Sequence, residues 1–508
     1  MPDINVLLLT GDQWRHECLS ALGHPVVETP HLDALAADGV LFTRHFANSS
    51  PCGPSRASLH TGLYAMTHRS VRNGTPLDAR FTNWALELRR AGYDPALIGY
   101  TDTAPDPRRH APGDPVLRTY EGVLPGLTPH LVMRSDRRSW LSHLRRKGYD
   151  VPAFAGELYT PQTSDPAMAE KRGPSYPPGA FKAEDSDTAY ETDEAIAYID
   201  AHADLAWCLH LSMLRPHPPL VAPAPWHDRY KPGQALPSQR LASVEAEAAM
   251  HPWLAWHLQG KAGIGAMPLH HQAQAKATYY GLIAEFDHHF GRLIAYLKRT
   301  GQYDRTLIVF TADHGEMLGD HWFAGKDGCF DAAYRVPMII KPPHKIMNKG
   351  GARGAVVDAF TEHVDLLPTL CDVVGLETPD QADGRSLGPF LEGKLPASWR
   401  LGVHVEYDFR DVVESKPEVA LGIDLDECCL AFWRGERFKY VHFAGLPPLF
   451  FDLETDPHEL RNLAGDPGHR EAMLGAAQAL LSHRLVHAER TLTATHLGSE
   501  GPIRRRGR

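Results

Sequence analysis

Short apolar runs alternate with helical patterns between residues 5 and 311, and this alternation constrains the fold more than any other feature of the sequence. The runs that predict strands cover residues 5–10, 96–100, 205–211 and 306–311, and the patterns that predict helices cover 30–36, 82–92 and 273–300. For the first helix we expect Thr29 as the N-cap and Pro30 in the first turn. Strands that alternate with helices indicate an α/β fold, with a large mixed, mostly parallel sheet covered by helices on both faces.

The pattern changes near residue 383. Short strand-like pieces at 402–407, 428–434, 438–443 and 449–453 predict a small antiparallel sheet, and 470–489 predicts a helix. We therefore expect two domains, a large α/β domain over 1–382 and a smaller C-terminal α+β subdomain over 383–508. Residues 105–187 are rich in Pro, Arg and Gly with weak periodicity, and 216–268 are similar, so we expect both to form loop insertions at the edge of the sheet.

The composition excludes several classes of protein. Of the 508 residues, 43% are hydrophobic and 22% charged, which supports a packed core. No run approaches the roughly 18 apolar residues of a membrane-spanning helix, and the N-terminus lacks the features of a secretion signal. The seven cysteines form no C-x-x-C pair, and the formal charge of −10 disfavours nucleic-acid binding. We expect a soluble, cytoplasmic protein with neither nucleic acid nor a membrane as partner.

Four polar residues follow the ends of predicted strands. Asp12, Tyr100, His217 and Asp313 each lie at or just past the carboxyl end of such a strand. Open α/β sheets bind their ligands at this edge, because the loops after parallel strands meet there. The sequence therefore predicts that these four side chains belong to one site.

The segment around Cys52, which reads CGPSR over residues 52–56, is the most informative stretch of the chain. A lone cysteine is usually a buried thiol. Here Pro51 and Pro54 bracket it at a predicted helix N-terminus, where backbone N–H groups and the helix dipole favour an anion. Arg56 adds a permanently charged donor fork suited to an oxyanion. This arrangement predicts a nucleophile directed at an anionic substrate.

A second group of residues predicts a metal site. Asp12, Gln13, Asp313 and His314 offer carboxylate, amide and imidazole ligands from two strand ends that we expect to be neighbours. Oxygen and nitrogen ligands together suit one divalent cation. The alternatives are that Asp12 caps a helix and that His314 is a packed polar residue.

The C-x-P-x-R pattern, continued to Thr61 and Gly62, resembles the signature of the type I sulfatases of the alkaline phosphatase superfamily. Residues 311–321 (TADHGEMLGDH) and 451–463 (FDLETDPHELRNL) are similar to further sulfatase blocks in the same order. More narrowly, residues 99–101, 214–219 and 442–448 resemble the phosphonate monoester hydrolases and related arylsulfatases. The resemblance covers nearly the full chain and implies an alkaline phosphatase-like catalytic domain.

The resemblance also implies cofactors. In that family a formylglycine-generating enzyme oxidises the cysteine that corresponds to Cys52, and the hydrated aldehyde becomes the nucleophile, a metal ligand and the site of a covalent intermediate. Many sulfatases have Asp where Gln13 stands and Asn where His314 stands, and they bind Ca²⁺. Gln13 and His314 match the phosphonate monoester hydrolase branch, so we expect Mn²⁺, with Ca²⁺ as the alternative.

Further residue roles follow from the same resemblance. His217 and Lys326 are expected to protonate the leaving oxygen, Arg56 to stabilise charge on the substrate, and Asn73 and Tyr100 to bind it by hydrogen bonds. Asp102 departs from the pattern, which has threonine there. An additional carboxylate facing an anionic substrate is repulsive unless it is paired, and it favours an arylsulfatase-like preference.

The expected activity is hydrolysis of monoanionic esters: aryl sulfates, phosphonate monoesters and phosphodiesters. Two alternatives stay open at this point. One is a metal-dependent phosphodiesterase of the same superfamily that keeps Cys52 as a thiol, and the other is an inactive binding protein on the same fold. The resemblance further implies a homodimer or homotetramer that assembles partly through its C-terminal tail.

Overall fold

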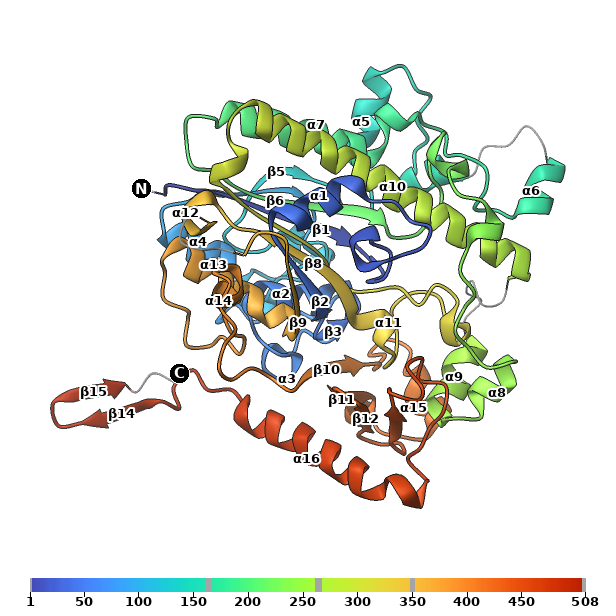
Figure 1. Cartoon of the computed structure of the whole chain (residues 1–508), viewed down its shortest axis with the longest axis vertical. Helices are drawn as coiled ribbons and strands as arrows, with labels where there is room; N and C mark the ends of the chain where they lie inside the picture. The colour runs from blue at the N-terminus through green and yellow to red at the C-terminus, as the bar shows by residue number, and fades with distance from the viewer. Residues whose placement is uncertain (1, 161–165, 261–266, 348–351, 505–508) are drawn as a thin grey trace.

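The computed structural model describes residues 2–160, 166–260, 267–347 and 352–504. Its largest element is an eight-stranded sheet with helices on both faces (Figure 1). The strand order is β5 (Thr128–Val132), β4 (Pro95–Gly99), β6 (Cys208–Pro216), β1 (Asn5–Asp12), β7 (Thr306–Ala312), β8 (Arg335–Lys341), β2 (Val40–Phe46) and β9 (Ala355–Glu362). Strand β8 runs antiparallel to both of its neighbours, and the other pairs of this sheet are parallel. The expected mixed, mostly parallel sheet is confirmed.

Side chains of the central strand β1 alternate between two hydrophobic cores. Leu7 and Leu9 pack into one core and Val6 and Leu8 into the other, as expected for a strand buried on both faces. The first core contains α1 (Pro30–Asp38), α5 (Arg138–Arg146), α7 (Asp187–Ala201) and α10 (Leu269–Arg299), and the second contains α2 (Cys52–Thr61), α4 (Trp84–Arg90), α13 (Leu366–Val374) and α14 (Gly388–Leu391).

A second, smaller sheet lies below the first in Figure 1. Its antiparallel strands are β13 (Leu449–Asp452), β12 (Phe438–Phe443), β11 (Cys429–Gly435) and β10 (Gly402–Asp408). The two-residue strand β3 (Ser49–Ser50) joins β10 in parallel, with Ser49 opposite Glu406. Because β3 comes directly before α2, the segment around Cys52 connects the two sheets. The expected boundary at residue 382 stays a prediction.

The remaining elements are short helices and the C-terminal region. The short helices are α3 (Ala65–His68), α6 (Pro166–Arg172), α8 (Val244–Ala248), α9 (Pro252–Gly260), α11 (Asp331–Tyr334), α12 (His344–Met347) and α15 (Lys416–Leu421). Helix α16 (Arg470–Val486) packs on the small sheet, and the hairpin of β14 (Thr495–Gly498) and β15 (Gly501–Arg504) projects from the body (Figure 1). Among the described residues, no helix is long and apolar enough to cross a membrane.

The C-terminal region exposes apolar side chains, as an association surface would. Leu485 on α16 and Leu497 on β14 are among them. Whether copies of the chain associate through this tail stays a prediction, and residues 505–508 of the tail lie outside the described residues.

Several sequence predictions need correction. The strand expected at 205–211 begins at Cys208 and ends at Pro216, because residues 202–205 form a turn after α7. Thr29 occupies the N-cap position of α1 and Pro30 its first turn, as expected, but the Thr29 side chain makes no cap hydrogen bond. Its hydroxyl donates to Asp33, and the first-turn N–H groups of His31 and Leu32 donate to Asp287 of α10. A carboxylate distant in sequence thus replaces the local cap, which no local pattern predicts.

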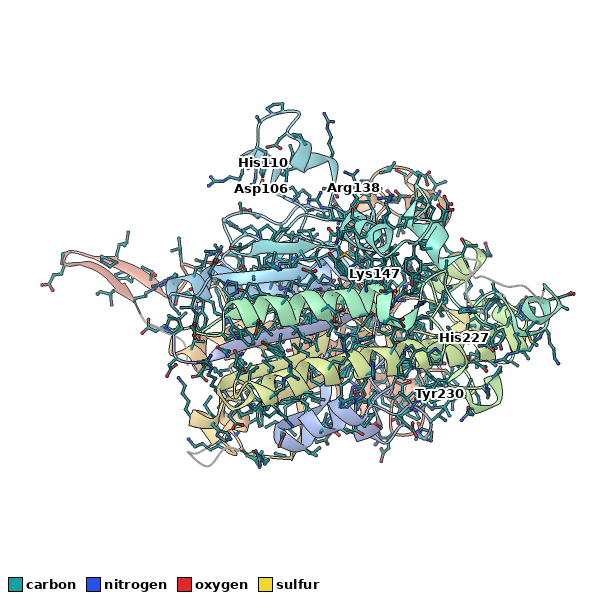
Figure 2. The ribbon with its side chains drawn as sticks, turned by 90° about the horizontal axis from the view of Figure 1, so that it is seen from above. Asp106, His110, Arg138, Lys147, His227 and Tyr230 are labelled. Atoms are coloured by element: carbon teal, nitrogen blue, oxygen red, sulfur yellow. The ribbon has the colours of Figure 1, made fainter. Side chains whose placement is uncertain are left out.

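The segment 105–187 is more regular than expected. It contributes β5 to the edge of the large sheet and α5 to its cover. In Figure 2, Asp106 and His110 lie on a loop that stands out from the body, whereas Arg138 and Lys147, at the two ends of α5, lie closer to the sheet. His227 and Tyr230, from the other expected insertion, lie beside α10. The first segment therefore covers part of the large sheet, whereas the second packs against α10 and, through α9, in the core beside the small sheet.

We predict that Gly99→Ala strongly destabilises the fold. Gly99 ends β4 with φ +110°, and a Cβ there would lie 1.9 Å from the Ser212 carbonyl oxygen of β6. The positive φ and the clash together should lower the free energy of unfolding by about 2–5 kcal/mol. Gly113→Ala is the matched control, because Gly113 has φ +87° and nothing within 4 Å of its added Cβ. Urea unfolding measures both, and equal losses would contradict the prediction.

Candidate active site

The four polar residues expected at strand ends do come together. Asp12 ends β1, and Tyr100, His217 and Asp313 directly follow β4, β6 and β7. These strands are consecutive in the sheet, in the order β4, β6, β1, β7. Their parallel direction brings the four carboxyl ends to one edge. The four residues therefore lie together at one edge of the sheet, as expected, and their shared function stays a prediction.

Cys52 enters this site from the N-terminus of α2. Its side chain belongs to the first residue of the helix, and the residue is 4% exposed. The next N–H group, of Gly53, donates to Asn73 Oδ1 at 2.8 Å. A Cβ on Gly53 would lie 3.0 Å from that oxygen, so glycine allows the close contact. The Ser55 hydroxyl donates to the Asp313 carbonyl and joins the helix to the end of β7.

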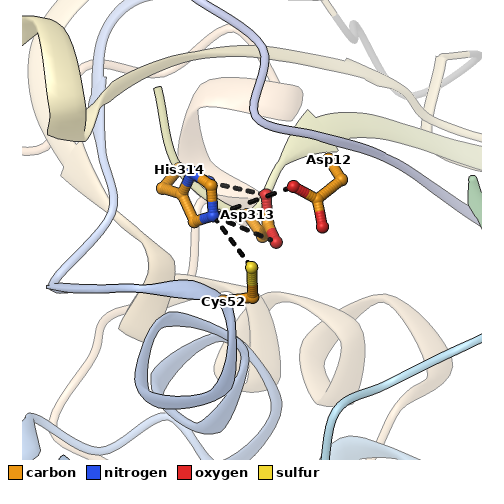
Figure 3. Close-up of side chains that lie close together, drawn as sticks. All are labelled: Asp12, Cys52, Asp313 and His314. Carbon is orange, nitrogen blue, oxygen red and sulfur yellow. Dashed lines mark hydrogen bonds and ion pairs between the residues drawn. The ribbon is translucent and has the colours of Figure 1, made fainter. Parts of the chain in front are cut away.

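Four of the predicted residues form one cluster of possible metal ligands. Asp12, Cys52, Asp313 and His314 each direct one ligand atom toward the others, all within 4.8 Å of one another (Figure 3). His314 Nε2 lies 3.3 Å from Cys52 Sγ, 3.6 Å from Asp313 Oδ2 and 3.8 Å from Asp12 Oδ1. These residues come from β1, α2 and the loop after β7, so only the fold brings them together.

The protonation of His314 suits a metal ligand. Its Nδ1 lies 3.0 Å from the Gly315 carbonyl, which can only accept, so Nδ1 carries the hydrogen. The Nε2 lone pair therefore faces the cluster. Burial, together with the positive charge of Lys326, lowers the pKa of His314 to about 3, so the ring is neutral at pH 7.

Asp12 carries an unused acceptor in the same place. Its Oδ1 is buried and has no hydrogen-bond partner among the described residues, while Oδ2 accepts from the Tyr100 hydroxyl and from Arg56 Nη2 at 3.2 Å. Burial opposes ionisation of Asp12, but the surrounding cationic groups outweigh it and hold its pKa well below the usual range. Burial and the neighbouring Asp12 raise the pKa of Asp313. A bound divalent cation would neutralise both carboxylates and occupy the free oxygen, so the donor set fits one.

Gln13 completes the predicted ligand set. Its backbone N–H donates to Asp313 Oδ1 at 3.0 Å, and its side-chain Oε1 accepts from Lys326 Nζ at 2.8 Å. The other end of the amide, Nε2, donates to Glu316. The amide oxygen is thus on the side of Lys326 and Cys52.

Arg56 binds the carboxylates of the site. The residue is 1% exposed, and its guanidinium donates to Asp313 Oδ2 at 3.0 Å and to Asp12 Oδ2 at 3.2 Å. A third nitrogen donates to Ser212 Oγ at 2.7 Å and to the Tyr100 carbonyl at 3.2 Å. Arg56 therefore holds two predicted metal ligands in place, and its expected contact with substrate oxygens stays a prediction.

Lys326 and His217 meet beside Cys52. Lys326 Nζ lies 3.1 Å from Cys52 Sγ and 3.2 Å from His217 Nε2. His217 Nδ1 lies 2.5 Å from the Pro218 carbonyl and so carries the ring hydrogen, which leaves Nε2 to accept from Lys326. Burial and the charge of Lys326 lower the pKa of His217 to about 4. Burial acts against the charge of Lys326, but Cys52, Asp12 and Asp313 outweigh it and raise its pKa. The proton therefore resides on Lys326.

The remaining predicted residues lie at the margin of the cluster. Asn73 is exposed, and its carbonyl oxygen is occupied by the Gly53 N–H group. The Tyr100 hydroxyl donates to Asp12, so it supports a ligand in this structure. Burial raises the pKa of Asp102 to about 7. The substrate contacts expected of Asn73 and Tyr100 stay predictions.

The sequence reasoning missed supporting residues. Glu316 lies within the motif at 311–321 but received no role, although its position three residues after Asp313 is a usable signal. His363 donates through Nε2 to the Asp313 carbonyl at 3.0 Å and accepts from His45 at its Nδ1, also at 3.0 Å. Nothing in the local sequence marks His45 or His363, because their pairing depends on adjacent strands β2 and β9.

Comparisons with known proteins agree with this geometry. A sequence model described as sulfatase matches residues 4–376, and a model described as N-sulphoglucosamine sulphohydrolase, C-terminal, matches residues 319–485. The multifunctional alkaline phosphatase superfamily protein PehA of Trinickia caryophylli is 40% identical, with 98% of each chain covered. An arylsulfatase of Clostridium perfringens is 27% identical, with 92% of this chain and 91% of the relative covered.

Comparison with solved structures also finds hydrolases of this kind. The phosphonate monoester hydrolase of Agrobacterium radiobacter superposes with a TM-score of 0.93 at 45% identity, covering 99% of this chain and 100% of that one. The phosphonate monoester hydrolase SpPMH from Silicibacter pomeroyi superposes with a TM-score of 0.92 at 42% identity, covering 99% of both chains. The fold is therefore shared with these enzymes over the whole chain.

We predict that a divalent cation stabilises the protein through this cluster. Excess Mn²⁺ added to chelator-treated protein should raise the free energy of unfolding by about 2.7 kcal/mol at a free concentration of 100 Kd. Asp12→Asn should remove most of this gain, because it replaces a carboxylate ligand by a neutral amide. Asp287→Asn is the matched control, since Asp287 is equally buried but caps α1 outside the cluster. Thermal unfolding with and without Mn²⁺ measures the gain; an equal gain in Asp12→Asn and the parent would argue against the site.

Proposed function

The chain belongs to the sulfatase family of the alkaline phosphatase superfamily, and from this premise we propose that it hydrolyses monoanionic esters with a formylglycine derived from Cys52 as nucleophile. The esters are aryl sulfates, phosphonate monoesters and phosphodiesters. That the protein is a hydrolase of sulfuric or phosphonic esters follows from its similarity to arylsulfatases and phosphonate monoester hydrolases. The observation that carries the finer proposal is that residue 52 lies between His314 Nε2 and Lys326 Nζ, at 3.3 and 3.1 Å.

The state of the thiol supports its conversion. Burial and the neighbouring Asp12 carboxylate raise the pKa of Cys52 well above its usual value. A thiol that stays protonated at neutral pH is a poor nucleophile, since the thiolate is the reactive form. An unmodified Cys52 is therefore a weak basis for catalysis in this environment. A formylglycine-generating enzyme is the partner that the conversion requires.

The metal would be held by Asp12, Gln13, Asp313 and His314, together with the side chain of residue 52. When bound, a divalent cation supplies Lewis-acid polarisation and lowers the pKa of a hydroxyl group next to it. The mixture of oxygen and imidazole ligands favours Mn²⁺ over Ca²⁺, because Ca²⁺ prefers oxygen ligands alone.

The basic side chains of the site have different roles. Arg56 orients Asp12 and Asp313 at the strand ends through one ion pair to each carboxylate. Lys326 is protonated, and its Nζ lies 3.1 Å from Cys52 Sγ, so a proton is available inside the site for the departing oxygen. His217 is neutral and accepts from Lys326, which fixes the direction of the ammonium group. Of the two groups expected to protonate the leaving oxygen, we therefore propose Lys326 as the donor, with His217 in a supporting role.

The charge of the site favours substrates with one negative charge. A single cation site with Lys326 nearby offers limited positive charge, and an ionised Asp102 would reduce it further. Dianionic phosphate monoesters would be disfavoured by this balance, whereas sulfate monoesters, phosphonate monoesters and phosphodiesters match it.

We predict that the active protein carries an aldehyde at position 52. Mass spectrometry of the peptide that spans Cys52 should show formylglycine after coexpression with a formylglycine-generating enzyme, and Cys52→Ala should reduce ester hydrolysis to background. The assay panel is an aryl sulfate, a phosphonate monoester, a phosphodiester and a phosphate monoester with the same aryl leaving group. The first three should be hydrolysed with higher kcat/KM than the fourth, because they are monoanionic.

Two outcomes would overturn this proposal. An unmodified thiol in fully active protein would favour the metal-dependent phosphodiesterase with an intact Cys52. A Cys52→Ala variant that keeps its function, in protein that copurifies without metal, would favour the inactive binding protein.

We also predict a leaving-group dependence for Lys326. Lys326→Met should lower kcat/KM by about 10²- to 10⁴-fold for alkyl esters, whose leaving oxygen needs a proton, and much less for p-nitrophenyl esters. Lys341→Met is the control, because Lys341 is a buried lysine outside the site that donates to the carbonyls of Tyr303 and Thr306, whereas Lys326 is half-buried. Steady-state kinetics measure the effect, and an equal loss on both ester types would exclude the role of proton donor.

A further inference from the structure

The side-chain amide of Gln13 has one possible orientation. Gln13 is 2% exposed, and its side chain lies between a hydrogen-bond donor and an acceptor. Lys326 Nζ, which can only donate, lies 2.8 Å from Oε1, and the carboxylate of Glu316, which accepts, faces Nε2. A rotated amide would place NH₂ against an ammonium group and an oxygen against a carboxylate. The oxygen of Gln13 therefore faces the cluster.

The carboxylate of Glu316 accepts hydrogen bonds from three donors. It is 3% exposed, and its Oε1 accepts from the backbone N–H groups of Leu318 and Gly325, each at 2.7 Å. Its Oε2 accepts from Gln13 Nε2. Only an ionised carboxylate offers acceptors to all three, because a glutamine at this position would have an NH₂ group on one side.

The same carboxylate also orders the loop that ends at Lys326. The loop begins next to Glu316, and Gly325, the residue before Lys326, donates to Glu316 Oε1. The Met317 N–H group closes the loop by donating to the Gly325 carbonyl at 2.7 Å. Glu316 thus accepts from Gln13, a predicted metal ligand, with Oε2. With Oε1 it accepts from Gly325, the residue before Lys326.

We propose that Glu316 is a positioning residue that turns the Gln13 amide oxygen, rather than its NH₂ group, toward the bound divalent cation and so sets the metal affinity of the site. The inference rests on the proposed function in taking Gln13 as a metal ligand. Residues that orient ligands through hydrogen bonds commonly change metal affinity when they are replaced.

The consequence of Glu316→Gln follows from the donors around it. Because Leu318 and Gly325 both present N–H groups, the substituted amide keeps its oxygen toward them and turns its NH₂ group toward Gln13. Gln13 must then rotate to accept this hydrogen bond. Its own NH₂ group now faces Lys326 and the cation, so a ligand is lost and two donors oppose each other.

Exchanging the two residue types between positions 13 and 316 should restore the hydrogen bond between these side chains. In the double variant Gln13→Glu with Glu316→Gln, the new NH₂ group at position 316 donates to one carboxylate oxygen at position 13, and the other oxygen faces the cluster. The total charge of the pair is unchanged. Gln13→Glu alone places two carboxylates against each other and is expected to weaken the site.

The test is a Mn²⁺ titration of chelator-treated protein, followed by calorimetry and by the electron paramagnetic resonance signal of free Mn²⁺. Glu316→Gln should weaken Mn²⁺ binding by about 10- to 100-fold, and the exchanged double variant should recover most of the loss. Glu406→Gln is the matched control, because Glu406 is also buried and accepts a backbone N–H, from Met66, and a side-chain donor, Arg484. It should bind Mn²⁺ like the parent.

The outcomes separate this inference from the proposed function. Parent-like Mn²⁺ binding in Glu316→Gln, or a double variant as weak as Glu316→Gln, would overturn the role of Glu316. A parent that binds no Mn²⁺ would overturn it as well. If the exchange restores Mn²⁺ binding while none of the esters is hydrolysed by formylglycine-containing protein, Glu316 keeps its role and the proposed function fails.

Discussion

The buried contact between Arg56 and the carboxylates of Asp12 and Asp313 is the interaction on which the site depends. Two carboxylates enclosed this deeply repel each other and lose their hydration, so an unpaired arrangement would be costly. One guanidinium compensates both, and its remaining donors reach Ser212 and the Tyr100 carbonyl. A side chain from α2 therefore joins residues of β1 and β6 to the residues that follow β4 and β7. The position of α2 and the geometry of the strand ends are consequently coupled.

Burial also decides which groups of the site are charged. Histidines at the centre are kept neutral: the pKa of His314 lies at about 3 and that of His217 at about 4. They act as lone-pair donors, whereas the permanent positive charge comes from Arg56 and Lys326. The chain as a whole has a formal charge of −10, so attraction of an anionic ester depends on this local concentration of cations and on the metal. Long-range attraction contributes little.

Much of the fold and of the site is predictable from local patterns. Apolar runs of strand length identified β1, β4 and β7, and the residues after them identified Asp12, Tyr100 and Asp313, because strand direction alone determines where such residues meet. What local patterns missed depends on contacts between distant segments. Thr29 could cap α1 with its hydroxyl, yet the N–H groups of the first turn donate to Asp287 of α10 instead. Glu316 acquires its role only when the loop before Lys326 folds back over it.

The pairing of the short strand β3 limits the time during which Cys52 is accessible while the chain folds. Ser49 and Ser50 pair with β10, a strand more than 350 residues later in sequence, and α2 begins at Cys52 with every residue buried. Once these contacts form, an enzyme can no longer hold the segment as an extended peptide. On the proposed function, the oxidation of Cys52 therefore competes in time with the arrival and docking of the C-terminal sheet. In molecules that fold before this oxidation, Cys52 would stay a buried thiol, so the active fraction of a preparation would reflect the order of folding and oxidation.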